Sequence, residues 1–128
     1  MKKRILKFHY EEIVYALIIL ATNLKGYSEE DLKSFAEAIH RLDTLSNRDF
    51  LKELKLINPK LDDEIISSLV GLQGLVSKLY CSLWYKLLAK DNDELVKSFT
   101  LSRQLLKKLG ESYIEPIKYA KKNMDTNW

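Results

Sequence analysis

The chain has 128 residues, of which 46% are hydrophobic and 30% are charged, and its net charge is +3. This length suits one domain, and the composition is too apolar for a disordered chain. The single cysteine, Cys81, excludes an internal disulfide, and four Gly and two Pro are too few for the frequent turns of a β-sandwich. We therefore predict an all-α fold, with one domain over residues 1–128.

The first predicted helix runs from about His9 to Lys25 and contains the most apolar stretch of the chain, IVYALIILAT at 13–22. The nine residues from Ile13 to Ala21 would span about 14 Å as a helix, against about 30 Å for the hydrocarbon core of a membrane. Glu11 and Glu12 directly precede them, which is not the pattern of a secretion signal. The stretch is therefore predicted to be the buried centre of a cytoplasmic protein.

Two shorter helices are predicted next. The segment SEEDLKSFAEAIHRL has Ser28 as a helix cap and apolar residues at helical spacing behind it. The segment SNRDFLKELKLINP repeats the pattern more briefly, with Ser46 as the cap and Pro59 shortly after the end.

The longest predicted helix is central and covers about 62–89. Gly71 and Gly74 lie inside it, and each costs about 1 kcal/mol relative to Ala. Such glycines indicate either a close approach by a neighbouring helix or a kink.

Two further helices are predicted at about 94–109 and 113–123. Gly110 is expected to end the first of them, and Pro116 fits the first turn of the second. The expected architecture is a bundle of five to six helices.

Acidic residues concentrate in the middle of the chain, because residues 28–64 carry four more acidic than basic side chains. Two acidic triplets open predicted helices, where they complement the positive end of the helix dipole. Alternatively, both triplets project from one end of the bundle and meet a basic protein surface. The predicted partner-binding residues are Glu29, Glu30, Asp31, Asp62, Asp63 and Glu64.

Basic residues concentrate at the two ends of the chain, and if they converge in space they could hold phosphates. Lysines greatly outnumber arginines, however, and no helix presents a row of base-reading side chains. A solvated helix face is the simpler interpretation. Nucleic-acid binding is thus an alternative function that ranks below protein binding.

The segment RILKFH, from Arg4 to His9, matches the Arg-x4-6-His signature of HEPN-type ribonucleases, which are also small helical domains. The resemblance implies that Arg4 would position phosphate and that His9 would move a proton at the scissile 2′-hydroxyl. In that family the motif lies within a late helix, whereas here it precedes the first predicted helix. A HEPN-like ribonuclease is the second alternative.

Other signatures of chemistry are missing from the sequence. His9 and His40 are its only histidines, and it contains no HExxH, no CxxC and no Gly-rich phosphate loop. We therefore predict a protein that is not an enzyme and that holds no metal or cofactor.

In size, predicted compactness and lack of catalytic motifs, the chain is similar to small all-helical bacterial immunity proteins. Those proteins bind and occlude secreted nuclease toxins of the colicin and contact-dependent inhibition systems. The resemblance implies a protein-binding inhibitor that covers the active site of a toxin, such as a basic nuclease. Inhibitors of basic nucleases are often strongly acidic, whereas this chain carries +3, so residues 28–64 would supply the complementary charge.

Overall fold

The computed structural model describes residues 2–22, 29–45, 47–84, 93–112 and 115–123. Over these residues the chain forms six α-helices and one 3-10 helix, with no strand. The elements are α1 (Lys2–Ala21), α2 (Glu29–Leu45), α3 (Arg48–Glu53), η1 (Leu54–Leu56), α4 (Asp63–Trp84), α5 (Asp93–Lys108) and α6 (Pro116–Asn123). The predicted all-α bundle is confirmed, and its long helix is α4; residues 85–89 lie outside the described residues.

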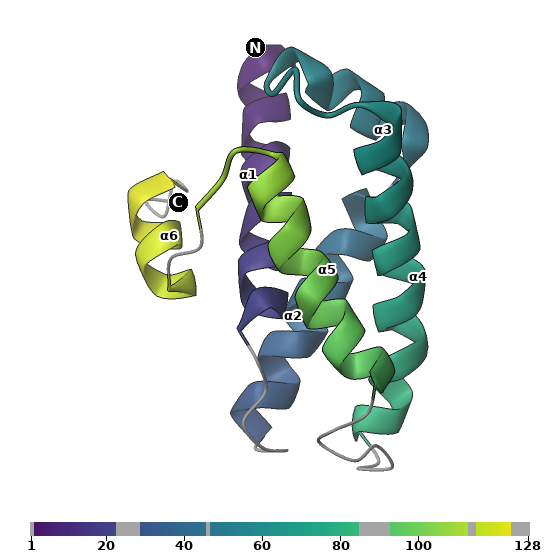
Figure 1. Ribbon diagram of the computed structural model, residues 1–128. Coiled ribbons are helices and arrows are strands. Elements are labelled where there is room, and N and C mark those ends of the chain that lie inside the picture. Colours follow the sequence, from purple (N-terminus) through teal and green to yellow (C-terminus); the bar gives the residue numbers. More distant parts are fainter. Residues whose placement is uncertain (1, 23–28, 46, 85–92, 113–114, 124–128) are drawn as a thin grey trace.

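The four long helices α1, α2, α4 and α5 run up and down beside one another (Figure 1). The short elements α3 and η1 cross the end of the bundle at which α1 and α4 begin. The short helix α6 lies on the outer side of α1. This arrangement gives the bundle two distinct ends, and the candidate site depends on which residues each end carries.

Helix α1 is the centre of the core. It packs against α2, α5, α6 and η1. Its second half is apolar on nearly every side, as expected for a buried helix. No helix in the described part of the chain is both long and apolar enough to cross a membrane. The buried side chains of α1 are Leu6, Tyr10, Ile13, Val14, Ala16, Leu17, Ile18, Ile19, Leu20 and Ala21.

Helix α1 begins at Lys2, so the predicted start at His9 is wrong. It ends at Ala21, and the predicted end, Lys25, lies outside the described residues. Leu6 and Tyr10 continue the inward helical spacing of the apolar stretch, and both are buried. Their burial outweighs the unfavourable placement of basic side chains in the first turn of a helix. The segment RILKFH therefore lies inside α1.

Side-chain caps begin α3 and α4. The Asn47 Oδ1 accepts hydrogen bonds from the backbone N–H groups of Asp49, at 2.9 Å, and Phe50, at 3.3 Å. The cap of α3 is thus Asn47; the predicted cap, Ser46, lies outside the described residues. The Asp62 Oδ1 accepts a hydrogen bond from the Ile65 N–H at 2.9 Å, which satisfies a backbone donor at the start of α4.

Gly110 ends α5 as predicted, with a backbone φ of 77°. The Gly110 N–H donates to the Lys107 carbonyl at 3.0 Å, and the Glu111 N–H donates to the Leu106 carbonyl at 2.9 Å. These two bonds form a Schellman motif, which needs a residue in the left-handed region.

Gly71 and Gly74 lie on the exposed face of α4. A Cβ atom added at either position would meet nothing within 4 Å. The close approach of a neighbouring helix, one of the two predicted explanations, is therefore not seen among the described residues.

Replacing Gly71 and Gly74 together by Ala is expected to raise the free energy of unfolding by about 1–2 kcal/mol, because the unfolded chain loses freedom and nothing clashes. Gly110→Ala should instead lower it by about 1 kcal/mol, since Ala is strained at that φ. Thermal unfolding followed by circular dichroism checks both changes. A double variant that melts below the parent would show that the outer face of α4 has a packing partner.

Candidate protein interface

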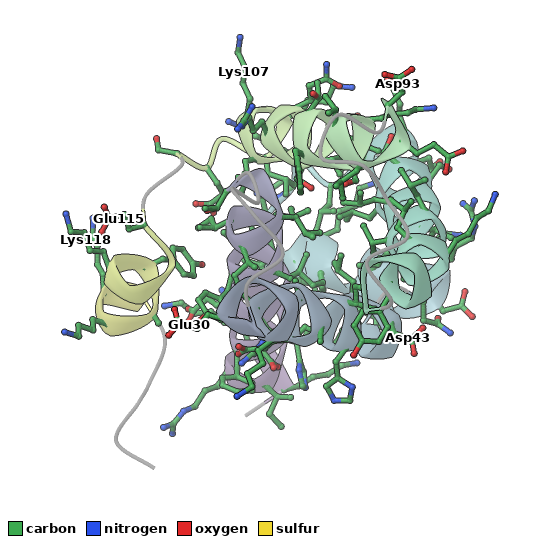
Figure 2. All side chains as sticks on the ribbon, turned by 90° about the horizontal axis from the view of Figure 1, so that it is seen from below. Glu30, Asp43, Asp93, Lys107, Glu115 and Lys118 are labelled. Carbon is green, nitrogen blue, oxygen red and sulfur yellow. The ribbon has the colours of Figure 1, made fainter. Side chains whose placement is uncertain are left out.

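The two predicted acidic triplets lie at opposite ends of the bundle. Helix α2 begins at the lower end of Figure 1, whereas α4 begins at the upper end. Glu30 is exposed beside the start of α2 (Figure 2), and the side chains of Glu29 and Asp31 lie outside the described part. The expectation that both triplets share one end is therefore wrong, while their role in partner binding stays a prediction.

The three acidic residues at the start of α4, Asp62, Asp63 and Glu64, differ in their contacts. Asp62 caps the helix through its bond to the Ile65 N–H. Glu64 lies 3.6 Å from the Lys108 ammonium, and both side chains are at least half exposed, so this ion pair contributes little to stability. Asp63 is exposed and forms no ion pair within the described residues. Asp63 and Glu64 are thus available for a partner, whereas Asp62 already has a local structural role.

At the same end of the bundle, three basic side chains of α1 lie beside two apolar residues. Together with the end of η1 and the residue after it, they line an open hollow of about 580 Å³. Leu56, at the end of η1, is 68% exposed, the largest value among the large hydrophobic side chains of the described residues. We call this surface the Leu56 hollow; its residues are Lys3, Arg4, Lys7, Leu56 and Ile57.

The spacing of Leu54 and Leu56 on η1 explains why Leu56 faces solvent. Successive residues of a 3-10 helix are turned by about 120°, so residues two apart point in different directions. Leu54 is fully buried and holds η1 on the core, which turns Leu56 outward. Sequence reasoning missed Leu56, although one signal was present: Leu51 and Leu54 share helical spacing, and Leu56 does not.

The other basic residues form separate exposed groups. Lys107 and Lys108 line a second open hollow with Gln104, at the end of α5. Figure 2 shows Lys107 on α5 and Lys118 on α6 pointing away from the bundle. The basic ends of the chain are therefore spread over α1, α5 and α6 rather than joined in one hollow.

A charged network joins α1 to α2. The Arg41 Nη1 donates to the Glu12 Oε2 at 2.8 Å, and its Nη2 donates to the Glu37 Oε1 at 3.0 Å. The other oxygen of Glu12 lies 3.0 Å from the His9 Nδ1. The guanidinium carbon of Arg41 also lies 5.0 Å from the centre of the Tyr15 ring, within the range of a cation–π interaction. This network fixes how α2 sits on α1.

Arg4 and His9, the residues of the HEPN-like signature, lie on different sides of α1. Five residues apart on an α-helix, they are rotated by about 140°. Arg4 lines the Leu56 hollow, whereas His9 contacts Glu12 and the ring of Phe50, 5.5 Å away. The structure does not bring this pair to a common site.

A second network ties the segment after α5 to α1. The Tyr10 hydroxyl donates to the Glu111 Oε1 at 2.9 Å. The Asn58 Nδ2 donates to the Tyr10 hydroxyl at 2.7 Å and to the Leu109 carbonyl at 2.9 Å. Burial raises the pKa of Tyr10 above its ordinary value of 10.0, and the charge of Glu111 adds to that increase.

The aromatic contact between α1 and α6 is the stacked pair Tyr15–Tyr119, with ring centres 6.5 Å apart. Tyr119 is buried, and this burial raises the pKa of its hydroxyl, with Glu111 and Glu11 adding to the increase. Burial also raises the pKa of the Glu11 carboxyl, and the positive charge of Lys7 partly opposes this increase. These groups hold α6 and the segment after α5 on α1. We therefore interpret them as structural residues rather than as part of a binding site.

Within the residues that the structure describes, no three His, Cys, Asp or Glu side chains gather as a metal site would require. Comparisons with known protein families, curated proteins and solved structures found no match. The candidate interface therefore rests on geometry. It is the end of the bundle that carries the Leu56 hollow together with Asp63 and Glu64.

Proposed function

We propose that this chain is a protein-binding inhibitor of the immunity type, which acts in the cytoplasm and covers the active site of a toxin. The observation that carries the proposal is the 68% exposure of Leu56 beside three cations. A protein interface combines an apolar centre with a polar rim, and Arg is enriched in it. Binding would remove the apolar surface of Leu56 from water.

Charges of both signs at this end would give the interface its specificity. Asp63 and Glu64 would face basic residues of a nuclease, whereas the cations of the Leu56 hollow would face acidic ones. Helices of this length separate the two ends of the bundle by about 25–30 Å. The proposed interface therefore includes Asp63 and Glu64, and leaves out Glu29, Glu30 and Asp31.

One observation favours nucleic-acid binding as a second candidate function. Lys3, Arg4 and Lys7 line the same hollow, and several phosphates would bind cations so arranged. Affinity would then fall steeply with salt concentration. A protein interface centred on Leu56 would lose less affinity, because burial of apolar surface is little affected by moderate salt.

A pull-down of the tagged full chain from its host cells, read by mass spectrometry of the intact complex, tests the proposed function. We expect a stoichiometric protein partner that is toxic when expressed alone. Recovery of RNA or DNA, or of the chain alone, would contradict the proposal.

With the purified partner, Asp63→Lys combined with Glu64→Lys should slow association by about tenfold at low salt, because both substitutions reverse the field that steers a basic surface. The cap residue Asp62 is untouched, so the loss of stability should stay within about 1–2 kcal/mol. Stopped-flow mixing measures the association rate. Glu30→Lys, at the other end of the bundle, is the control. It reverses one charge rather than two, so an effect of half the size or more from that variant would move the interface away from Leu56.

A further inference from the structure

The first two turns of α1 concentrate positive charge at the end of the helix where the dipole does not favour it. The first turn holds no acidic residue, and the start of a helix is already the positive end of its dipole. Lys7 lies four residues after Lys3 and three after Arg4, which are the spacings at which like charges repel on a helix. An anion bound at this corner would relieve both effects.

Two of these cations are available to such an anion. Lys2 lies 3.8 Å from Glu53, and Lys7 lies 4.0 Å from Glu11. Lys3 and Arg4 form no ion pair with any residue that the structure describes. Arg4 presents a planar fork of N–H donors that matches a carboxylate.

The apolar lining of the hollow is aliphatic rather than aromatic. Leu56 and Ile57 are the apolar residues that line it, and no Phe, Tyr or Trp among the described residues does so. Proteins that hold single-stranded nucleic acid stack its bases on aromatic rings. An aliphatic lining instead suits the leucine, isoleucine or valine side chain of another protein, because contact removes apolar surface of both from water.

We infer that the Leu56 hollow binds an acidic segment of a partner protein, in which an aliphatic side chain packs on Leu56 and Ile57 while flanking carboxylates meet Lys3 and Arg4. The inference rests on the proposed protein-binding function and specifies the chemistry of the partner segment. Charge complementarity fixes the sign of the segment, and the exposed leucine requires its apolar centre.

The test is an NMR titration of the isotope-labelled full chain with three probes. The first is a synthetic amphipathic peptide with leucines on one face and glutamates beside them. The second is the same peptide with each glutamate replaced by lysine, and the third is a single-stranded DNA oligomer. We expect the acidic peptide to shift the amide signals of the first two turns of α1 and of η1, and the other two probes to leave these signals in place.

Two variants locate the binding site. Leu56→Asp and Arg4→Glu should each raise the dissociation constant of the acidic peptide by about tenfold or more. Both positions are exposed, and a carboxylate at position 4 suits the start of a helix, so the fold should persist. Lys118→Glu on α6 makes the same reversal of charge outside the hollow and should leave the affinity unchanged.

The inference is overturned if the acidic peptide shifts none of these signals up to about 1 mM. It is also overturned if the lysine peptide or the DNA oligomer binds there instead, or if Leu56→Asp leaves the affinity unchanged. The proposed inhibitor function is judged separately by the pull-down. A toxin captured equally well by the parent chain and by Leu56→Asp would reject this inference and leave the inhibitor function standing.

Discussion

As the pH rises above about 10, the free energy of unfolding should fall by about 1.4 kcal/mol per pH unit for each of two tyrosines, Tyr10 and Tyr119. Burial raises the pKa of both hydroxyls well above the ordinary value of 10.0. Above that value the unfolded chain releases these protons while the folded chain keeps them, so the unfolded state is favoured. The contribution of the two buried hydroxyls to the free energy of unfolding is therefore fully present below pH 10 and is lost progressively above it.

Urea unfolding at a series of alkaline pH values, with tyrosinate absorbance recorded on the same samples, measures this effect. Tyr119→Phe is the control, because it removes one of the two groups and should reduce the slope by about 1.4 kcal/mol per pH unit. Ionisation of lysines affects the parent and the variant alike and cancels in the comparison. If both chains show the same slope, Tyr119 ionises without unfolding.

The second large effect is expected at Arg41. Arg41→Ala should lower the free energy of unfolding by about 2–3 kcal/mol, because Glu12 is then left with a mostly buried carboxylate and loses its closest donor, at 2.8 Å. The same change removes the cation above Tyr15. Arg41→Lys should recover only part of the loss, since one ammonium cannot match both carboxylates and cover the ring.

Chemical unfolding of the Arg41 variants, each alone and combined with Glu12→Gln, measures the coupling between the two side chains. Arg48→Ala is the matched control. Arg48 is exposed and donates to the Ser67 hydroxyl at 3.1 Å, so its loss should cost about 0.5 kcal/mol or less. If Arg41→Ala costs no more than this control, the network contributes nothing to the fold.

The parts of the fold that followed from the sequence were those set by local patterns. Gly110 could be identified as a helix end because few other residues adopt a positive φ. Pro116 could be placed at the start of α6 because it lacks a backbone donor there. The start of α1 was missed because basic residues in a first turn oppose a helix, and only the burial of Leu6 and Tyr10 against other elements overrides them.

The candidate interface depended on topology, which no local pattern contains. The acidic triplets look alike in the sequence, and they separate only because α2 and α4 begin at opposite ends of the bundle. Helical spacing sets Leu54, three residues after Leu51, apart from Leu56, but it does not show that Leu56 lies exposed at one end of the bundle. On η1, which crosses the end of the bundle between α3 and α4, Leu54 is buried and Leu56 is exposed.

The central position of α1 has a consequence for the synthesis of this protein. The apolar half of α1 leaves the ribosome well before α5, which supplies part of its cover. The hydrogen bond from the Arg103 Nε to the Ala21 carbonyl, 3.1 Å long, joins residues 82 positions apart. Until α5 emerges, this surface has α2 as its main cover and is open to aggregation or to chaperones that bind extended apolar stretches. Slow translation between α2 and α5 would therefore lower the yield of soluble protein without any change in the stability of the finished fold.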